Sequence, residues 1–356
     1  MPPSVAEQNP SRKSSSHFVI DRRQALSMGL ATASTLLLPK KSFANADATK
    51  PVRFGIISDI HKDVMHDADS RLDTFVKAMI EQDVDFILQL GDFCIPATYN
   101  LPFMKIWNSF SGPRHHVLGN HDMDGNGTER PDVAYGWRRA ETVEYWGMKS
   151  PYYSFDHSGV HFIILDGNDK KPEGQSGYRR WVGEKQLEWL EKDLQQTKLA
   201  TFVFIHQSPE NIADGGVENG KQVQAVLEKA NAEGDRKVIA CFTGHHHRDY
   251  LRRLGSIWYP QINSASYYWL GGKYLQVRYS EEIDAEYPYI KYTVPYKDPL
   301  FAVVTVDLAN QAMSITGGKT EFVGPSPWEQ GASREELDAE SLVAQISNRQ
   351  ISLERK

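Results

Sequence analysis

Short apolar segments alternate with segments of helical period from residue 52 onward, and this alternation restricts the possible folds most strongly. Six apolar segments have the length and the β-branched or aromatic content of buried strands, namely residues 52–57, 84–90, 116–118, 160–165, 201–205 and 238–242. Strands that alternate with helices favour an α/β protein, in which helices cover the sheets, over an all-α or all-β protein.

The segment between the first two predicted strands has the periodicity of an amphipathic helix. Its apolar residues recur at i, i+3, i+4, i+7 and i+8, and they are Leu72, Phe75, Val76, Met79 and Ile80. Asp69 and Ser70 stand just before this pattern, where a helix cap is expected. Two further helices are predicted around residues 187–194 and 223–230.

Polar side chains follow five of the six predicted strands directly. These polar segments are Ser58 to His61, Gly91-Asp92, Gly119 to Asp122, His206 and Thr243 to His247. Because α/β sheets place their ligand sites at the carboxyl ends of strands, we expect these side chains to meet. Nitrogen and oxygen donors without thiolates favour a pair of cations such as Mn, Fe or Zn. The two cysteines, Cys94 and Cys241, are too few for a disulfide framework or a Cys-ligated zinc cluster, and a bridge between them stays open.

The spacing within these segments predicts how the ligands divide between two metal ions. Residues i and i+2 of an extended segment point the same way, so Asp59 and His61 are expected to reach one metal, and His245 and His247 to act as a similar pair. Two cations about 3.5–4 Å apart need a ligand that touches both, and Asp92 is the candidate. A glycine in three of these segments fits a tight turn at the strand end.

These residues resemble the calcineurin-like metallophosphoesterases, whose ordered signature is D-x-H, GD, GNH followed by Asp or Glu, an isolated His, and GHxH. The signature stands here as Asp59-Ile60-His61, Gly91-Asp92, Gly119-Asn120-His121-Asp122, His206 and Gly244-His245-His246-His247. The resemblance spans roughly residues 52 to 260 in the family's order, which makes it far more specific than any single motif. It implies a four-layer αββα sandwich with the metal site at the carboxyl ends of strands.

The resemblance also implies a role for each signature residue. The expected ligands are Asp59, His61 and His247 for the first ion, Asn120, His206 and His245 for the second, and Asp92 for both. A hydroxide held by the two metals would attack phosphorus in line. His121 would stay off the metals and donate a proton to the leaving oxygen, as the catalytic acid.

Two positions depart from the patterns of better-known relatives. Many members carry GDxxD, whose second Asp supports the proton-donating histidine, whereas this chain has Ile95 there. The orientation of His121 must then come from elsewhere, with Asp122 as a candidate. Purple acid phosphatases place a metal-binding tyrosine at the position of Ile95 and begin with D-x-D, so Ile95 and His61 argue against a tyrosinate–iron centre.

The resemblance indicates the reaction and leaves the substrate open. D-x-H with GNHD and no tyrosine ligand is similar to the bacterial cyclic-nucleotide and glycerophosphodiester branch, which favours a small phosphodiester. A phosphomonoesterase and a non-catalytic exported binding protein that keeps the fold are the alternatives. The net charge of −6, without a basic stripe, disfavours a nuclease and any nucleic-acid partner.

Residues 1–46 have the features of an export signal. Arg22-Arg23 precedes an uncharged stretch at 27–39, and Ala44-Asn45-Ala46 offers a small-x-small cleavage site. The arginine pair is similar to a twin-arginine signal, which is an address and not an anchor. We therefore expect a periplasmic or extracellular protein without a stable membrane anchor after signal removal. Its remaining 310 residues carry a charge near −10, because residues 1–46 hold six Lys and Arg against two Asp and Glu.

The rest of the chain is expected to divide into two parts. Residues 47–323 would form the phosphoesterase domain, which includes a tyrosine-rich accessory segment at 263–299. That segment suits either a rim for substrate or a protein partner, or a hairpin that packs on itself. Residues 324–356 are expected to be a loosely attached helix or a disordered tail. The oligomeric state is not indicated.

Overall fold

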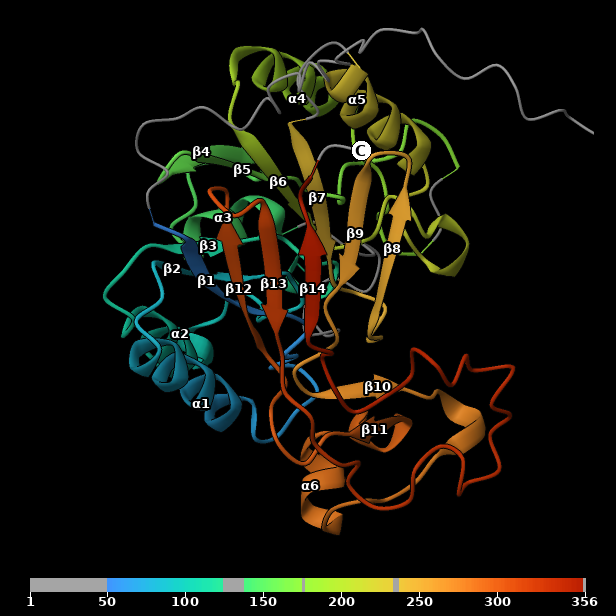
Figure 1. Ribbon diagram of the computed structural model, residues 1–356. Helices are drawn as coiled ribbons and strands as arrows, with labels where there is room; N and C mark the ends of the chain where they lie inside the picture. Colours follow the sequence, from blue (N-terminus) through green and yellow to red (C-terminus); the bar gives the residue numbers. More distant parts are fainter. Residues whose placement is uncertain (1–49, 124–137, 175–176, 233–236, 355–356) are drawn as a thin grey trace, which may run out of the picture. The chain divides into compact units, whose positions relative to one another are not determined.

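The computed structural model describes residues 50–123, 138–174, 177–232 and 237–354, and the predicted export signal lies outside them. Within this part of the chain, two six-stranded sheets and a two-stranded hairpin form the framework (Figure 1). No helix of these described residues is long and apolar enough to cross a membrane.

The first sheet combines a parallel half with an antiparallel half. Its strands are β1 (Val52–Ile57), β2 (Phe86–Gln89), β3 (Arg114–His116), β12 (Ala302–Asp307), β13 (Ala312–Thr316) and β14 (Arg349–Ser352). They lie in the order β14-β13-β12-β1-β2-β3. Because β1, β2 and β3 are parallel, their carboxyl ends lie at one edge.

The second sheet is parallel in its centre and antiparallel at both edges. Its strands are β4 (Tyr153–His157), β5 (Val160–Ile164), β6 (Ala200–Ile205), β7 (Val238–Thr243), β8 (Tyr250–Leu254) and β9 (Ile257–Gln261). The order is β4-β5-β6-β7-β9-β8, in which β5, β6, β7 and β9 run parallel. The carboxyl ends of β6 and β7 therefore also share one edge.

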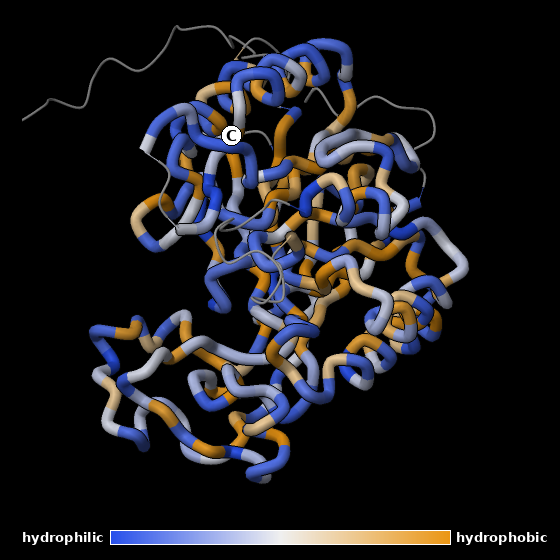
Figure 2. Tube along the Cα trace, turned by 180° about the vertical axis from the view of Figure 1, so that it is seen from behind, coloured by the Kyte–Doolittle hydropathy of each residue, from blue (hydrophilic) through white to orange (hydrophobic). Residues whose placement is uncertain are grey.

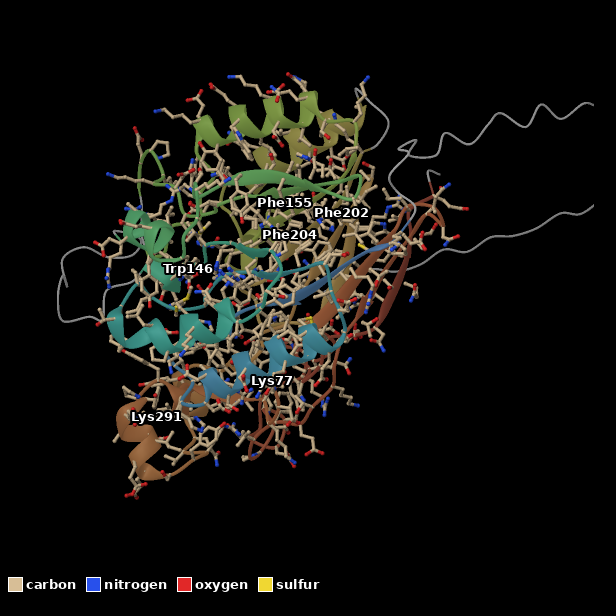
Figure 3. All side chains as sticks on the ribbon, turned by 90° about the vertical axis from the view of Figure 1, so that its left-hand side faces the viewer. Lys77, Trp146, Phe155, Phe202, Phe204 and Lys291 are labelled. Atoms are coloured by element: carbon tan, nitrogen blue, oxygen red, sulfur yellow. The ribbon has the colours of Figure 1, made fainter. Side chains whose placement is uncertain are left out.

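Helices cover the outer face of each sheet. Their bounds are α1 (Ala68–Glu81), α2 (Leu101–Asn108), α3 (Arg139–Tyr145), α4 (Glu184–Gln196), α5 (Gly220–Ala232) and α6 (Glu281–Glu286). The α1 and α2 helices pack on the first sheet, and α4 and α5 pack on the second. Figure 3 shows Phe155, Phe202 and Phe204 in the interior between these helix layers.

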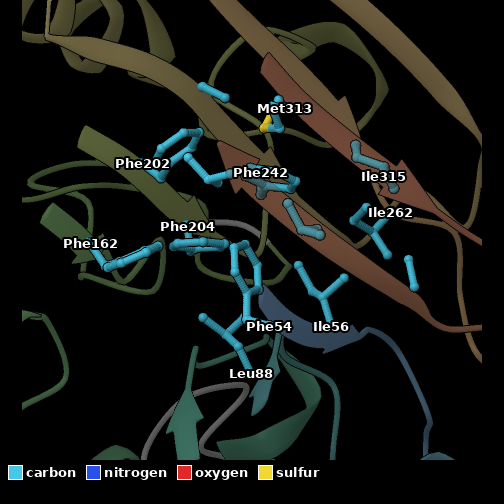
Figure 4. Packing of buried hydrophobic residues seen from close by; sticks show 14 of the residues in the cluster. Phe54, Ile56, Leu88, Phe162, Phe202, Phe204, Phe242, Ile262, Met313 and Ile315 are labelled. Carbon is cyan, nitrogen blue, oxygen red and sulfur yellow. The ribbon is translucent and has the colours of Figure 1, made fainter. Parts of the chain in front are cut away.

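Successive side chains of a strand point to opposite faces of the sheet, and this alternation produces the four layers. In β6, Phe202 and Phe204 face the first sheet, while Val203 and Ile205 face the α4–α5 layer. The ring of Phe54 in β1 meets Phe204 edge-on, with ring centroids 5.8 Å apart (Figure 4). Hydrophobic residues accordingly follow the strands, whereas the helices mix both kinds (Figure 2). The predicted α/β fold, a four-layer αββα sandwich, is confirmed.

Most predicted strands are present, with shifted ends. The strand predicted at 116–118 begins earlier, at Arg114. The predicted cap of the first helix is wrong, because α1 begins at Ala68 and Asp69 lies in its first turn. The Asp69 carboxylate instead pairs with Lys62, 3.1 Å away.

The expectation of a loosely attached helix or a disordered tail is wrong for the end of the chain. The β14 strand pairs with β13, and Ile351 is buried in the core between the sheets. Arg349 pairs with Asp249 at 2.9 Å, and the Asn263 amide donates to the carbonyl of Val343 at 2.7 Å. The tail is held by the buried apolar side chains of Ile346, Ile351 and Leu353, and by polar contacts with distant residues. These contacts leave no periodic pattern in the sequence.

The tyrosine-rich segment contains an antiparallel pair, β10 (Tyr267–Trp269) and β11 (Thr293–Pro295), with α6 between them in sequence. The ring of Trp269 stacks on Tyr292 with centroids 5.6 Å apart. The segment therefore packs partly on itself, while the ring of Tyr279 packs on His66 and Tyr267 reaches the polar cluster described next. A role as a rim for substrate or a protein partner stays a prediction.

Candidate metal centre

The strand ends that carry the signature residues leave the sheets in left-handed turns. Positive φ angles occur at Asp59 (50°), His61 (53°), Asp92 (51°), His245 (71°) and His247 (50°). Such angles are uncommon outside glycine and cluster at functional sites, where the surrounding structure compensates their cost. The argument from i, i+2 alternation in an extended segment is therefore wrong in its geometry. Asp59 and His61 do converge on one group, whereas His245 and His247 belong to different groups.

Glycines are needed here because other atoms approach them closely. A Cβ on Gly91, whose φ is 100°, would lie 2.5 Å from His206 Nδ1. At Gly119 the added carbon would overlap the backbone nitrogen and a carboxylate oxygen of Asp92. Gly119 therefore allows two strand ends of the first sheet to touch, which is a steric requirement and not a torsional one.

Asp59, His61 and His247 form the first group of donors. Their ligand atoms all lie within 4.8 Å of one another, and the three residues are buried. His247 Nε2 lies 3.1 Å from Asp59 Oδ1 and 3.3 Å from His61 Nε2. The group joins the end of β1 in the first sheet to the turn after β7 in the second.

Asp92, His206 and His245 form the second group. Their ligand atoms also lie within 4.8 Å of one another. Asn120 adds an oxygen, since its Oδ1 lies 3.2 Å from His206 Nε2. His245 faces His206 with Nδ1, 3.3 Å from the same Nε2 atom. All four residues predicted for the second ion, the shared Asp92 included, are thus in contact.

One carboxylate oxygen joins the two groups. Asp92 Oδ2 lies 3.1 Å from His206 Nε2 and 3.6 Å from His61 Nε2. Asp92 Oδ2 therefore lies close to a histidine of each group, as expected for a bridging ligand. Asp59 Oδ1, 3.1 Å from His247 Nε2, is farther from the second group, at 3.9 Å from His206 Nε2.

Hydrogen bonds on the outer side of the rings fix which nitrogen faces inward. His206 Nδ1 donates to the Leu90 carbonyl at 2.7 Å, and His247 Nδ1 donates to the Tyr267 carbonyl at 2.7 Å. Each bond requires a proton on Nδ1 and leaves the lone pair of Nε2 for the centre. This arrangement is typical of metal-binding histidines, whose second nitrogen usually donates to a carbonyl or carboxylate.

The donor set fits a pair of divalent or trivalent cations. The Nε2 atoms of His61 and His247 lie 3.3 Å apart, and two such lone pairs repel unless a proton or a cation lies between them. Burial alone lowers the pKa of His206, but the carboxylates of Asp92 and Asp59 outweigh it and raise that pKa to about 9. A cation at this centre would therefore replace a proton on His206 Nε2.

Asp122 has a different role from the one expected. Both of its oxygens accept backbone N–H groups, from Asp92 at 2.9 Å, Phe93 at 2.5 Å and Gly119 at 2.7 Å. Its carboxylate thus ties the turn after β2 to the turn after β3. The candidate role of Asp122 in orienting His121 is not supported, because these bonds use both oxygens.

His121 lies beside the two donor groups and is more exposed, with 28 % of its side chain accessible. Its backbone N–H donates to Asp92 Oδ1 at 2.8 Å. Its ring centroid is 5.1 Å from that of His61 and 4.8 Å from that of Tyr178, and Asp63 Oδ2 lies 3.8 Å from its Nδ1 atom.

Sequence reasoning missed three residues at this centre. Tyr267, which is 2 % exposed, packs its ring against His61 and His247 at centroid distances of 5.0 and 4.9 Å. Asp63 and Tyr178 are the other two. Asp63 could have been found, because it lies two residues after a predicted ligand, whereas nothing local marks Tyr178.

The two cysteines do not form a bridge. Cys94 is buried under the first sheet and contacts Met104, while Cys241 is buried between the second sheet and its helices. Burial raises the pKa of both thiols, so neither is a reactive thiolate.

Comparison with known proteins gives the family whose signature residues form the two donor groups. The family model described as calcineurin-like phosphoesterase matches residues 52–249. Purple acid phosphatase 22 from Arabidopsis thaliana is 24% identical over an alignment of 227 positions, and the match covers 59% of this chain and 47% of that protein. The chain thus spans about half the length of this curated relative.

A crystal structure of a dimetal phosphatase from Danio rerio has a similar fold. It matches with a TM-score of 0.52 and 15% sequence identity, and the match covers 78% of this chain and 100% of that chain. At this identity the likeness concerns the fold alone.

Proposed function

Because the chain belongs to the calcineurin-like phosphoesterase family, we propose that it hydrolyses a phosphate ester with two bound metal ions, and that a small phosphodiester is its preferred substrate. The observation that carries the proposal is the pair of donor groups joined by Asp92 Oδ2. None of the expected ligands is replaced, which distinguishes this chain from a binding protein that keeps only the fold.

Two ions of the Mn, Fe or Zn type suit these nitrogen and oxygen donors. The residues that would hold them are Asp59, His61 and His247 on one side, Asn120, His206 and His245 on the other, and Asp92 between. When bound, such ions supply positive charge for the phosphoryl oxygens and lower the pKa of a coordinated water.

The protein residues around this pair have separate tasks. Asp122 fixes the two turns that carry Asp92 and Asn120, and the carbonyls of Leu90 and Tyr267 hold two histidine rings in place. His121 stands beside the centre at a point that solvent reaches. It is the candidate for proton donation to the leaving oxygen, a contribution of about 10²–10⁴ in rate.

The preference for a diester rests on the signature, and specifically on the absence of a tyrosine at position 95. Ile95 is buried and 8% exposed, so no tyrosinate ligand is available from that position. A phosphomonoesterase is the alternative, and purple acid phosphatase 22 bears the name of a phosphatase.

Nitrophenol release from bis(p-nitrophenyl) phosphate and from p-nitrophenyl phosphate, with and without added Mn or Zn, tests the proposal. We expect metal-dependent activity with the diester the faster substrate, and loss of both activity and bound metal in Asp92→Asn. Faster monoester hydrolysis would favour the alternative. Full metal binding without activity on either compound would contradict an esterase and favour a binding protein.

We also propose that the protein is exported and that residues 1–46 are removed. The support is the arginine pair, the uncharged stretch after it and the Ala44-Asn45-Ala46 site. Intact-mass measurement of protein recovered from the periplasm or the medium should give a chain that begins at Asp47. A full-length chain retained in the cytoplasm would contradict this.

A further inference from the structure

We propose that Asp63 is a positioning residue that holds the ring of His121 for proton donation, an inference that rests on the proposed function. The two carboxylate oxygens of Asp63 face two histidines. Oδ1 lies 3.1 Å from His61 Nδ1, and Oδ2 lies 3.8 Å from His121 Nδ1. One carboxylate therefore connects a predicted metal ligand to the predicted acid.

The backbone places Asp63 at this point. His61 has a left-handed conformation, and its carbonyl accepts the N–H groups of Val64 at 3.1 Å and Met65 at 2.9 Å. This tight turn carries Asp63 back beside the His61 ring. The Asp63 side chain is 35% exposed and that of His121 is 28% exposed, so both lie where a substrate can arrive.

Two other carboxylates near His121, among the residues that the structure describes, have different partners. Both oxygens of Asp122 accept backbone N–H groups, and Asp92 Oδ1 accepts the backbone N–H of His121 itself. Position 95 carries a buried isoleucine. Asp63 Oδ2, by contrast, faces the Nδ1 atom of His121 at 3.8 Å.

The distance of 3.8 Å is that of an ion pair and exceeds a direct hydrogen bond. Catalytic hydrogen bonds are often long in the free enzyme and shorten in the substrate complex. The edge-on contact of the ring with His61 and the contact with Tyr178 restrict its rotation. A small movement of the Asp63 side chain is then sufficient to close the bond.

The pairing assigns each ring nitrogen a task. Nδ1 donates its proton to Asp63, and Nε2 carries the proton for the ester oxygen. As an oxygen from water bonds to phosphorus, the bond between phosphorus and the ester oxygen breaks, its electron pair stays on the ester oxygen, and the proton of Nε2 moves there. His121 is left as a neutral imidazole that still donates from Nδ1 to Asp63.

Asp63→Asn is the informative variant because it keeps an oxygen for His61 and presents an amide N–H to His121. The assay uses methyl aryl phosphates whose phenols range from nitrophenol to phenol. A nitrophenolate leaves readily without a proton, so we expect less than about a threefold loss there and on the order of a 10²-fold loss with phenol. Asp63→Glu should restore part of the activity with phenol.

Controls separate a role of Asp63 in positioning His121 from general damage to the fold or to the metal centre. Asp69 lies in the same segment and pairs with Lys62, so Asp69→Asn serves as the control and should behave as wild type. His121→Asn should reproduce the dependence on the leaving group, and the double variant should be no slower than His121→Asn. An equal loss for all leaving groups, additive losses in the double variant, or a lowered metal content in Asp63→Asn would overturn the inference.

A second readout does not depend on activity. In the metal-free protein, the ¹⁵N resonances of the His121 ring should shift in Asp63→Asn and stay unchanged in Asp69→Asn. Unchanged His121 resonances in Asp63→Asn would overturn the inference by themselves. A wild-type protein inactive on every ester would instead count against the proposed function, while the resonances would still report on the Asp63–His121 pair.

Discussion

At the scale of single residues, the centre depends on close approach between strand ends more than on any one ligand. Asp92 offers Oδ2 to two histidines, while its Oδ1 and backbone nitrogen are held by His121 and Asp122. Gly119 lies against both the nitrogen and the carboxylate of Asp92. A change at this glycine should therefore disturb the shared ligand without removing any donor.

Gly119→Ala tests this dependence. The added carbon would overlap backbone atoms that cannot move aside, so we expect a destabilisation of about 1–3 kcal/mol and a clear loss of bound metal. Gly318→Ala is the matched control, because nothing lies within 4 Å of its added carbon. Denaturant unfolding and elemental analysis measure the two effects. Normal metal content in Gly119→Ala would contradict the role assigned to this contact.

The ligands could be predicted from the sequence because each follows a recognisable strand within a short, ordered motif. The residues that support these ligands could not be predicted, because their contacts with the ligands join positions far apart in the chain. Tyr267, for example, supports His61 across more than two hundred residues. Asp122 is only one candidate for orienting His121 on sequence grounds, and its contacts with three backbone N–H groups are not visible in the motif.

At the scale of elements, most predicted strands have nearly continuous apolar residues, as expected for strands buried on both faces, although β12 has a similar run and is not among the predicted strands. The β8 strand carries exposed arginines, and β14 contributes one buried side chain, so neither has the apolar run that marks β1 or β6. Pairing with a neighbouring strand defines these elements, and local sequence does not contain that information.

The attachment of β14 can be tested with Ile351→Ala. Its side chain is 3% exposed within the core between the sheets, so truncation should cost about 2 kcal/mol or more in the free energy of unfolding. Gln350→Ala, on the exposed face of the same strand, should change stability little. Equal stability of the two variants in urea would restore the expectation of a loosely attached tail.

His161 links β5 to β4 and α4 and should make stability depend on pH. Burial lowers its pKa, but hydrogen bonds to Asp193 at 2.8 Å and Asp156 at 2.5 Å outweigh burial and raise that pKa. The stabilisation is therefore fully present below the ordinary histidine pKa of 6.5 and is lost as pH rises through the raised value.

His161→Gln should accordingly destabilise the protein more at acidic pH than at alkaline pH, measured as the urea-unfolding free energy relative to wild type. Asp193→Asn should show the same trend, because it removes one of the two acceptors. A destabilisation by His161→Gln that is the same at both ends of the pH range would contradict this account.

At the scale of the whole molecule, two sheets of different topology meet so that their parallel centres contribute ligands to one place. The contact of His206, after β6, with the carbonyl of Leu90, after β2, joins the sheets directly at that edge. The aromatic core led by Phe54 and Phe204 holds the sheets face to face. The central claim is that this meeting point binds two cations through one shared carboxylate.

Anomalous diffraction from crystals of the protein loaded with Mn measures this claim most directly. The account predicts two peaks per chain, about 3.5–4 Å apart, with Asp92 between them and His121 bound to neither. A single peak, or two peaks that do not share Asp92, would contradict it.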